Sequence, residues 1–463
     1  MNRLKAGFAR GDITPMNGIP MEGYFSPRFS QGVLDELEVN VLALEAGEDR
    51  VLLVSIDNCE IYGDVLAEYR CQISQATGVP EAAVFIASTH THTGPCLISD
   101  EAAANYTMFG EPLTGAQQEL IREYRIFTCH RVVDAAGEAL KDLKAAQMGI
   151  GTGVAPEVAF IRLFRMKDGS ARTNPGAGNP DILHPIGTAD ERVHVLRFHR
   201  EGASDLVLVN YGNHPDTVSG CMISADWPGF LRRTFENAVA GTRCIFFNGA
   251  QGDVNHINVN DRQALQRRLT AENGSTGFAQ YIGRVVAAGA MQAYDRVEYR
   301  DVERIQFRQR IIHAPSNMPL PHEVEGARYV VALHEAGRDH ELPEKGMGIT
   351  TLVSEALRMI RLEHGPETFP LLLSALAVGD VAFLGIPGEP FTGIGLELKK
   401  TEGWAMVLPC GLVNAYWDYF PTMEAYAAGG YEARSSSYRA GVGELIVAEG
   451  KKLLTCLKDN IGG

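Results

Sequence analysis

The stretch AVFIASTHTHTGP, residues 83–95, joins a short apolar run to a histidine-rich turn. Residues 83–88 have the length and composition of a buried β-strand. Gly94 and Pro95 then favour a turn. In an extended chain alternate side chains face the same side, so His90 and His92 are expected to point into one space. This spacing is equally consistent with a metal site at the strand end and with a polar turn whose histidines are hydrogen-bonded.

Similar apolar runs predict further strands along the chain, at 39–46, 51–57, 205–212 and 243–249, with a tight hairpin at Gly379-Asp380 between runs 371–378 and 381–387. Helical periodicity predicts helices over 117–146, 228–239, 277–294, 323–337 and 350–364. The turn-rich stretches 99–116 and 165–190 are predicted to be long loops. The irregular alternation predicts an α/β fold, with a mixed central sheet and surrounding helices in one large domain over 1–463.

The composition excludes several classes of protein. The chain has 463 residues, of which 45% are hydrophobic and 21% charged, as in globular proteins. Its net charge of -15 argues against nucleic acid or an anionic membrane as a partner. No apolar run reaches the roughly eighteen residues of a membrane span, and the N-terminal sequence lacks a signal-peptide core. Eight cysteines without a CxxC pair predict reduced thiols and a cytoplasmic location.

Other polar residues also follow predicted strands, where the active-site residues of α/β folds usually lie. His214 comes after 205–212 in Asn213-His214-Pro215, and Glu389 comes after 381–387 in the segment PGEPF. The segment FNGAQGDVNH, residues 247–256, follows another strand but lacks the lysine of a phosphate-binding loop. A lone histidine is more often structural, and Glu389 suits either a metal ligand or an ordinary turn. The sequence has no GxSxG and no HExxH motif, which excludes two common hydrolase mechanisms.

Taken together and in chain order, six segments resemble the neutral (neutral/alkaline, non-lysosomal) ceramidase family. They cover nearly the whole chain and occur in the family's order. The segments are Asp12-Ile13-Thr14-Pro15, the HTHTGP run, Asn213-His214-Pro215, NGAQGDVN, Pro387-Gly388-Glu389-Pro390-Phe391, and the tyrosine-rich tail from Tyr419 to Tyr431-Glu432.

The resemblance implies a zinc-dependent hydrolase that cleaves a C–N amide bond through a metal-activated water. Carried over by motif, the zinc ligands are His90, His214, Glu389 and Tyr419. His92 and Tyr431 then stand beside the metal as catalytic residues. Zinc lowers the pKa of a bound water to about 7, and the resulting hydroxide would attack the substrate carbonyl. His92 and Tyr431 would stabilise the developing oxyanion, and His92 could pass a proton to the leaving nitrogen.

The chain also departs from the family. Asn255 stands where the family carries a serine, so any role that needs a hydroxyl there is lost. We expect the catalytic domain alone, without the family's C-terminal β-sandwich. No lipid-binding stripe is evident, so we expect a small, soluble substrate rather than ceramide. Two alternatives stay open: a lactone or ester hydrolase with the same zinc site, and a non-catalytic, zinc-containing binding protein. Self-association into a homo-oligomer is also left open.

Overall fold

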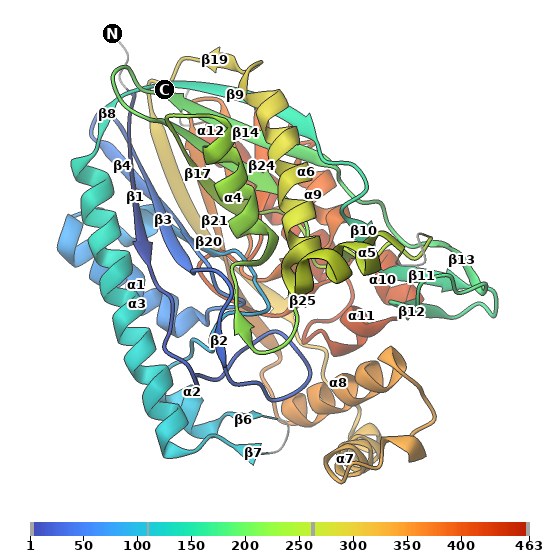
Figure 1. Cartoon of the computed structure of the whole chain (residues 1–463). Helices are drawn as coiled ribbons and strands as arrows, with labels where there is room; N and C mark the ends of the chain where they lie inside the picture. The colour runs from blue at the N-terminus through green and yellow to red at the C-terminus, as the bar shows by residue number, and fades with distance from the viewer. Residues whose placement is uncertain (1–3, 109–110, 261–263, 460–463) are drawn as a thin grey trace.

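Three β-sheets form the interior of the computed structural model, which describes residues 4–108, 111–260 and 264–459 (Figure 1). The first sheet has the order β5 (Val84–Ser88), β4 (Asp49–Ile56), β3 (Glu38–Ala46), β1 (Leu4–Asp12), β8 (Lys144–Ala145). The second has the order β17 (Thr242–Asn248), β15 (Asp205–Tyr211), β14 (Arg192–His199), β9 (Gln147–Val154), β19 (Glu298–Arg300). The third has the order β20 (Ile305–Pro315), β21 (Thr368–Val378), β22 (Val381–Gly385), β24 (Met406–Cys410).

Each of these sheets contains one parallel pair in an otherwise antiparallel arrangement. The pairs are β4 with β5, β15 with β17, and β22 with β24. The sheets meet at a shared core, where the ring of Phe85 in β5 lies 6.0 Å from that of Phe247 in β17 and 6.3 Å from that of Phe383 in β22. The predicted α/β class with mixed β-structure is confirmed, and the mixed strands are divided among three adjoining sheets.

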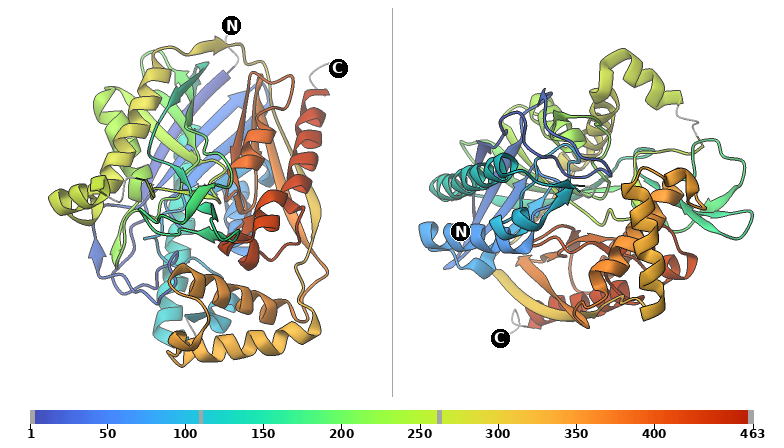
Figure 2. Two further views of the ribbon diagram at one scale, coloured as in Figure 1. Left: turned by 90° about the vertical axis from the view of Figure 1, so that its right-hand side faces the viewer. Right: turned by 90° about the horizontal axis from the view of Figure 1, so that it is seen from below.

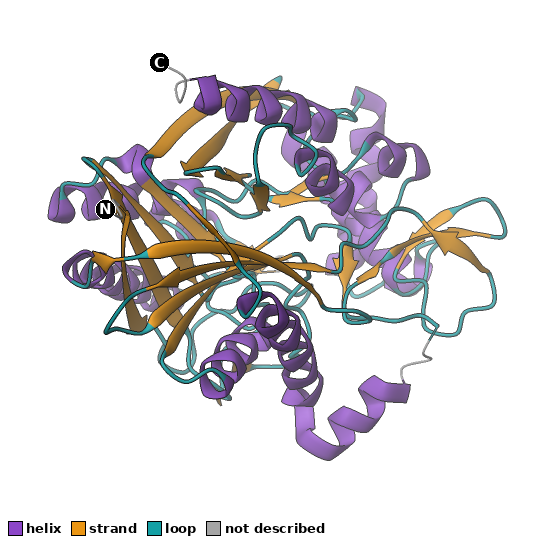
Figure 3. Cartoon of the chain, turned by 90° about the horizontal axis from the view of Figure 1, so that it is seen from above, coloured by secondary structure: helices purple, strands orange, loops and turns teal. Residues whose placement is uncertain are grey.

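Helices cover the outer faces of the sheets (Figures 1 and 3). The first sheet is covered by α3 (Gly115–Lys141), with α1 (Gly63–Thr77) beside it. The second is covered by α4 (Asp226–Ala238) and α6 (Gly277–Tyr294), and the third by α12 (Val442–Asp459) and α9 (Thr392–Leu398). None of the helices in the described part of the chain has the length and apolar character needed to cross a bilayer.

A helical hairpin of α7 (Pro321–Glu335) and α8 (Met347–Leu362) lies beyond one end of the sheets (Figures 1 and 2). It connects β20 to β21, which pair with each other along their whole length. The short helix α11 (Tyr431–Ser435) packs on α8. This group of helices faces the sheet ends at which β5, β15 and β22 stop.

Short elements complete the fold. The short helices are α2 (Asp100–Asn105), α5 (Ala264–Asn273) and α10 (Met423–Ala428). The small strand pairs are β2 (Gly32–Val33) with β16 (Met222–Ile223), β6 (Thr107–Met108) with β7 (Glu111–Pro112), β10 (Phe160–Ile161) with β18 (Val254–Asn255), and β23 (Glu389–Pro390) with β25 (Tyr419–Phe420). A further small sheet joins β12 (Ala171–Thr173), β11 (Leu163–Met166) and β13 (Ile182–Pro185).

The strands and helices predicted from apolar patterns are present, including the hairpin at Gly379, and two kinds of detail differ. The helix predicted over 117–146 ends at Lys141, because the next side chain, Asp142, accepts hydrogen bonds from the Phe8 backbone and from Arg200. The stretches predicted as loops at 99–116 and 165–190 contain short helices or strands, although residues 109–110 lie outside the described part of the chain.

Glycines in β9 allow α6 to approach the second sheet closely. A Cβ atom added to Gly153 would lie 1.9 Å from the carbonyl oxygen of Gly289 in α6. Gly151 is similarly tight, with 2.8 Å to the carbonyl oxygen of Ala293. The contacts are with backbone atoms, so a larger residue could be accommodated only by moving the helix.

We expect Gly153→Ala to lower the free energy of unfolding by about 1–3 kcal/mol, because overpacking forces the backbones of β9 and α6 apart. Gly137→Ala in α3 is the matched control, since its added Cβ meets nothing within 4 Å. That change should raise stability by about 0.5–1 kcal/mol, because alanine is the better helix former. Urea denaturation measures both, and equal effects would contradict the packing of α6 on β9.

Candidate metal centre

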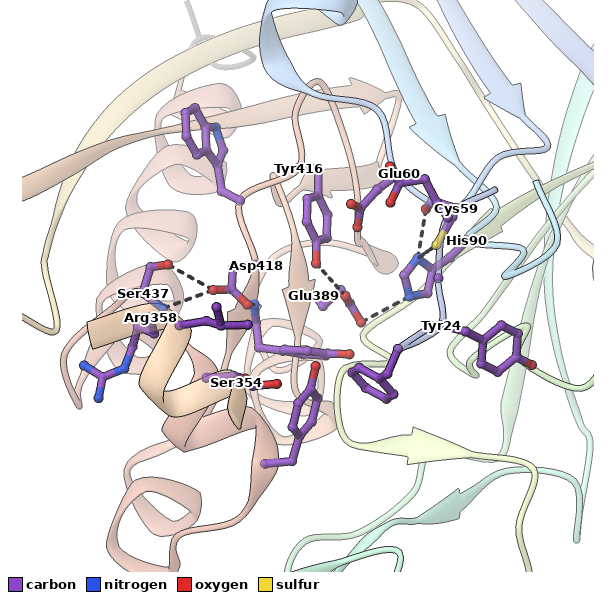
Figure 4. Close-up of a pocket in the computed structure, with 18 of the residues that line it drawn as sticks. Tyr24, Cys59, Glu60, His90, Ser354, Arg358, Glu389, Tyr416, Asp418 and Ser437 are labelled. Atoms are coloured by element: carbon purple, nitrogen blue, oxygen red, sulfur yellow. Dashed lines mark hydrogen bonds and ion pairs between the residues drawn. The ribbon is translucent and has the colours of Figure 1, made fainter. Parts of the chain in front are cut away.

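Three strand ends bring His90, His214 and Glu389 together. His90 follows β5 by two residues, His214 follows β15 by three, and Glu389 follows β22 by four. The Nε2 atoms of His90 and His214 lie 3.2 and 3.0 Å from Oε2 of Glu389. One donor atom from each residue lies within 4.8 Å of the others, and all three side chains are buried. The carboxyl ends of strands in three sheets therefore meet at one point, where Figure 4 shows His90 beside Glu389.

Backbone carbonyls determine the orientation of both imidazoles. Nδ1 of His90 lies 2.8 Å from the carbonyl oxygen of Cys59, and Nδ1 of His214 lies 2.9 Å from those of Gln251 and Val254. A carbonyl oxygen can only accept, so each Nδ1 carries the proton and donates it. In its neutral form each imidazole thus presents an unprotonated Nε2 toward the Glu389 carboxylate. Two lone pairs and one carboxylate facing a common point form an acceptor set that suits a cation.

The close packing of these buried side chains shifts their pKa values. Burial lowers the pKa of His90, but the nearby Glu389 carboxylate outweighs burial and raises that pKa above its usual value. Burial, followed by the positive charge of Arg162, lowers the pKa of His214. Burial would raise the pKa of Glu389, but the two histidines hold it well below its usual range. Glu389 is therefore ionised at neutral pH and can bind a metal.

Tyr419 lies beside this cluster because β25 pairs with β23, which places it directly opposite Glu389. Its ring stacks on the His214 imidazole, with 6.5 Å between centroids and 25° between planes. The Arg162 guanidinium donates a hydrogen bond of 3.2 Å to the Tyr419 hydroxyl and a bond of 2.6 Å to Glu432. Burial raises the pKa of Tyr419 well above its usual value, and the charge of Arg162 opposes that rise.

His92 stands next to His90, with 3.3 Å between their Nε2 atoms. The extended backbone predicted for this segment is wrong: β5 ends at Ser88, and His90 has a φ of +75° in the left-handed region. The two imidazoles still meet because the turn bends the chain back, and the His92 amide donates to the carbonyl of Pro215. Burial, with a further contribution from His90, lowers the pKa of His92 well below its usual value. His92 is therefore neutral at pH 7.

Tyr431 is the first residue of α11 and lines the same cavity. Its ring lies edge-on to that of Tyr419 at 5.8 Å and to that of Phe25 at 5.5 Å. Its backbone amide donates to the hydroxyl of Thr173, which holds the start of α11 in place. Burial raises the pKa of Tyr431 far above neutral pH, so its hydroxyl keeps a proton that it can donate.

The cavity in front of these residues has a volume of about 720 Å³. It is lined by His90, His92 and Glu389 and by Met347 and Leu357 of the helical hairpin. Pockets that bind small molecules have volumes of about 300–1,000 Å³. The volume thus matches a ligand of modest size.

Asn255 is not one of the described residues that line this cavity. Its amide Nδ2 donates to Oδ1 of Asn174 at 3.0 Å, and its Oδ1 accepts from the amide of Ile257. The side chain therefore tightens the turn that follows β18, in the segment whose carbonyls also orient His214.

Sequence analysis missed Arg162, Tyr416 and Cys59. Arg162 interrupts the apolar run AFIRLF, and its side chain is 7% exposed. Arginine is almost never fully buried unless it is paired, so a lone arginine in an apolar run could have signalled a functional ion pair. Tyr416, whose hydroxyl donates to Oε1 of Glu389 at 3.4 Å, lies in no recognisable motif. Cys59 acts through its backbone carbonyl, which side-chain patterns do not reveal.

Comparison with known proteins finds a similarity in structure but no match in sequence. The sequence matches no protein-family model and no curated protein. The crystal structure of neutral ceramidase from Pseudomonas aeruginosa superposes with a TM-score of 0.74, covering 99% of this chain and 75% of that one. A ceramidase complexed with C2 gives a TM-score of 0.72 over 99% of this chain and 76% of that one. The chain has the neutral ceramidase fold. Sequence identity to each structure is 18%.

The neutral ceramidase fold explains why the six resembling segments are spread along the chain. In this fold the segments that carry His90, His214 and Glu389 follow strands of three different sheets, and the Tyr419 segment pairs with the Glu389 segment. At 18% identity the likeness establishes the fold alone. The chemistry of the site depends on the residues of this chain.

Gly23 packs against His92, and this contact can be tested. A Cβ atom on Gly23 would lie 2.7 Å from Cγ of His92, whereas one on Gly18 would meet nothing within 4 Å. Both glycines have a left-handed φ, +100° and +90°. Both alanine variants therefore share the backbone strain, and Gly23→Ala should lose about 1–3 kcal/mol more from overpacking. Urea denaturation measures the difference, and equal losses would contradict the contact with His92.

Proposed function

We propose that this chain is a zinc-dependent hydrolase that cleaves the C–N amide bond of a small molecule. The observation that carries the proposal is the convergence of the Nε2 atoms of His90 and His214 with the Glu389 carboxylate, within 4.8 Å in a buried site. Without a cation, this arrangement directs lone pairs and negative charge at one another away from water, which is costly. In the proposal His90, His214, Glu389 and Tyr419 hold the zinc.

The donor set supports zinc among the common metals. Imidazole nitrogens with a carboxylate are typical of catalytic zinc sites, and each histidine has the backbone partner that usually orients a zinc ligand. Zinc bound at such a site lowers the pKa of a coordinated water to about 7 and so supplies hydroxide at neutral pH.

The residues around the proposed metal can assist amide cleavage. Tyr431 keeps its proton at neutral pH, so it can donate a hydrogen bond to the carbonyl oxygen as negative charge develops there. His92 is neutral and sits beside His90, so it can accept a proton and pass it to the leaving nitrogen. Arg162 donates to Tyr419 and holds that side chain against His214.

We further propose that residues 1–463 act as a catalytic domain on a small, soluble substrate. The cavity of about 720 Å³ supports a ligand of modest size. All eight cysteines are free thiols, which supports a cytoplasmic location. The position of Asn255 against Asn174 favours catalysis over the non-catalytic alternative, because the serine-to-asparagine difference falls at a turn rather than in the cavity wall. The remaining alternative is a lactone or ester hydrolase with the same zinc site. Hydrolysis rates on a panel of amides with matching esters and lactones distinguish it from an amide hydrolase.

We expect protein expressed with sufficient zinc to carry about one zinc per chain, because the two groups of converging donors in the described residues, His90-His214-Glu389 and Cys59-His90-His92, share His90. His90→Ala and Glu389→Ala should each remove the zinc and abolish turnover. His194→Ala is the matched control, because His194 is also buried but lies in β14, away from the cavity. Metal analysis by mass spectrometry measures the zinc content. Wild-type protein without zinc would contradict the proposed mechanism.

We expect Tyr431→Phe to keep the zinc and to lower kcat by about 10²–10³-fold, because the loss of one oxyanion donor has this effect in other hydrolases. Tyr426→Phe is the control, since the Tyr426 hydroxyl donates to the carbonyl of Tyr438 rather than to a substrate. Steady-state kinetics with a hydrolysed amide measures both variants. If Tyr431→Phe were as active as Tyr426→Phe, the role assigned to Tyr431 would be wrong.

A further inference from the structure

A second group of ionisable side chains lies in the wall of the same cavity. Glu60 follows Cys59, the residue whose carbonyl orients His90, and Glu22 comes from the loop before β2. The two carboxyl groups lie close enough for Glu22 to raise the pKa of Glu60. Tyr416 lies next to Glu60 and donates its hydroxyl proton to Oε1 of Glu389, so a single hydroxyl separates this pair from the candidate metal centre (Figure 4). The mechanism proposed above gives the pair no role.

No basic side chain in the described residues forms an ion pair with Glu22 or Glu60. Arg28 is near, but its guanidinium donates to the backbone carbonyls of Glu22, His92 and Gly220. Burial, followed by the charges of Glu22 and Glu389, raises the pKa of Glu60 well above its usual value. Three carboxyl groups thus crowd one end of the cavity, and none of the lysines and arginines that the structure describes forms an ion pair with Glu22 or Glu60. A positively charged ligand would relieve that crowding.

Aromatic rings surround the carboxyl pair. The Tyr62 hydroxyl donates to Oε1 of Glu60 at 3.3 Å, and the rings of Tyr62 and Tyr416 lie edge-on at 6.1 Å. Aromatic rings next to carboxylates form a favourable environment for an ammonium group. Glu22, Glu60, Tyr62 and Tyr416 all line the cavity of about 720 Å³ that also contains His90 and Glu389, so this group lies where a ligand can reach it.

We propose that Glu60, together with Glu22, binds an ammonium group of the substrate. The enzyme would then act on small amides that carry a protonated amine close to the scissile carbonyl. This inference rests on the proposed hydrolase function, because it assumes that the scissile bond lies at the His90–Glu389 centre. Tyr416 lies between Glu60 and Glu389. The ammonium group would therefore bind close to the scissile bond.

Binding is tested first, because it does not depend on turnover. The probes are phenethylammonium chloride and its neutral analogue 2-phenylethanol, and calorimetric titration measures their affinities for wild-type protein and for Glu60→Gln. We expect wild type to prefer the ammonium, and Glu60→Gln to bind it about tenfold or more weakly, because one charged hydrogen bond is lost. Glu22→Gln should act in the same direction. Glu48→Gln is the control, since Glu48 is exposed in the turn between β3 and β4.

Unchanged ammonium binding in Glu60→Gln would overturn the inference, since the amine would then bind elsewhere or at the metal. Equal affinity of wild type for the ammonium and the alcohol would also overturn it. A melting curve shows whether each variant is folded. If Glu60→Gln does not fold, the comparison is made with Glu22→Gln alone.

Turnover is tested with β-alanine p-nitroanilide and butyric acid p-nitroanilide, which differ by an ammonium in place of a methyl group. We expect wild type to favour the amine in kcat/KM by about tenfold or more, and Glu60→Gln to lose this preference, so that its ratio of kcat/KM for the two substrates falls to about one. Hydrolysis of both at equal rates would contradict the ammonium site and leave the hydrolase proposal intact. Ammonium binding that depends on Glu60, without hydrolysis of either substrate, would contradict the hydrolase function alone.

Discussion

The hydrogen bonds from Nδ1 of His90 and His214 to backbone carbonyls constrain the whole site. Since each Nδ1 must donate, each Nε2 is left as an acceptor, and both acceptors face the carboxylate of Glu389. If either imidazole turned away, it would lose a buried hydrogen bond to a backbone carbonyl, which is costly. The carbonyls belong to turns after β4 and after β17. The strand ends therefore fix the proton positions of the site as well as the positions of its side chains.

The three-sheet arrangement explains how residues so far apart in sequence come together. Each sheet contributes one parallel pair, and the chain after each pair turns inward at the same end of the molecule. Phe85 contacts both Phe247 and Phe383, so the sheets share a core directly behind the site. The pairing of β23 with β25 then adds Tyr419 next to Glu389. A rigid core thus supports side chains that could not stay this close by themselves.

Sequence patterns predicted the parts of the fold that depend on continuous apolar runs. The runs at 51–57 and 205–212 became β4 and β15, because a strand buried on both faces needs apolar side chains throughout. The strand β9, with the sequence QMGIGTGV, was missed. Its glycines are typical of turns. In β9, however, they leave room for the backbone of α6, which passes within contact distance. Short-range patterns cannot show that a distant helix occupies the space of a side chain.

The same limit applies to the site. His90 and His92 stood out because they are two residues apart, although the backbone between them is a turn rather than a strand. His214 and Glu389 gained meaning only from the ordered set of segments that resembles a known family. Arg162, Glu60 and Tyr416 lie in no recognisable motif, and their importance depends on contacts between residues far apart in the chain.

The helical hairpin of α7 and α8 is an insertion and does not belong to the sheet framework. It is inserted between β20 and β21, which pair along their entire length whatever connects them. Met347 and Leu357 of this insertion form cavity wall, whereas the three residues of the candidate metal centre follow strands of the framework. The connector can change in length or composition without disturbing the sheet behind it. Over evolution, the range of accepted molecules can thus diverge while the chemistry at the centre is preserved.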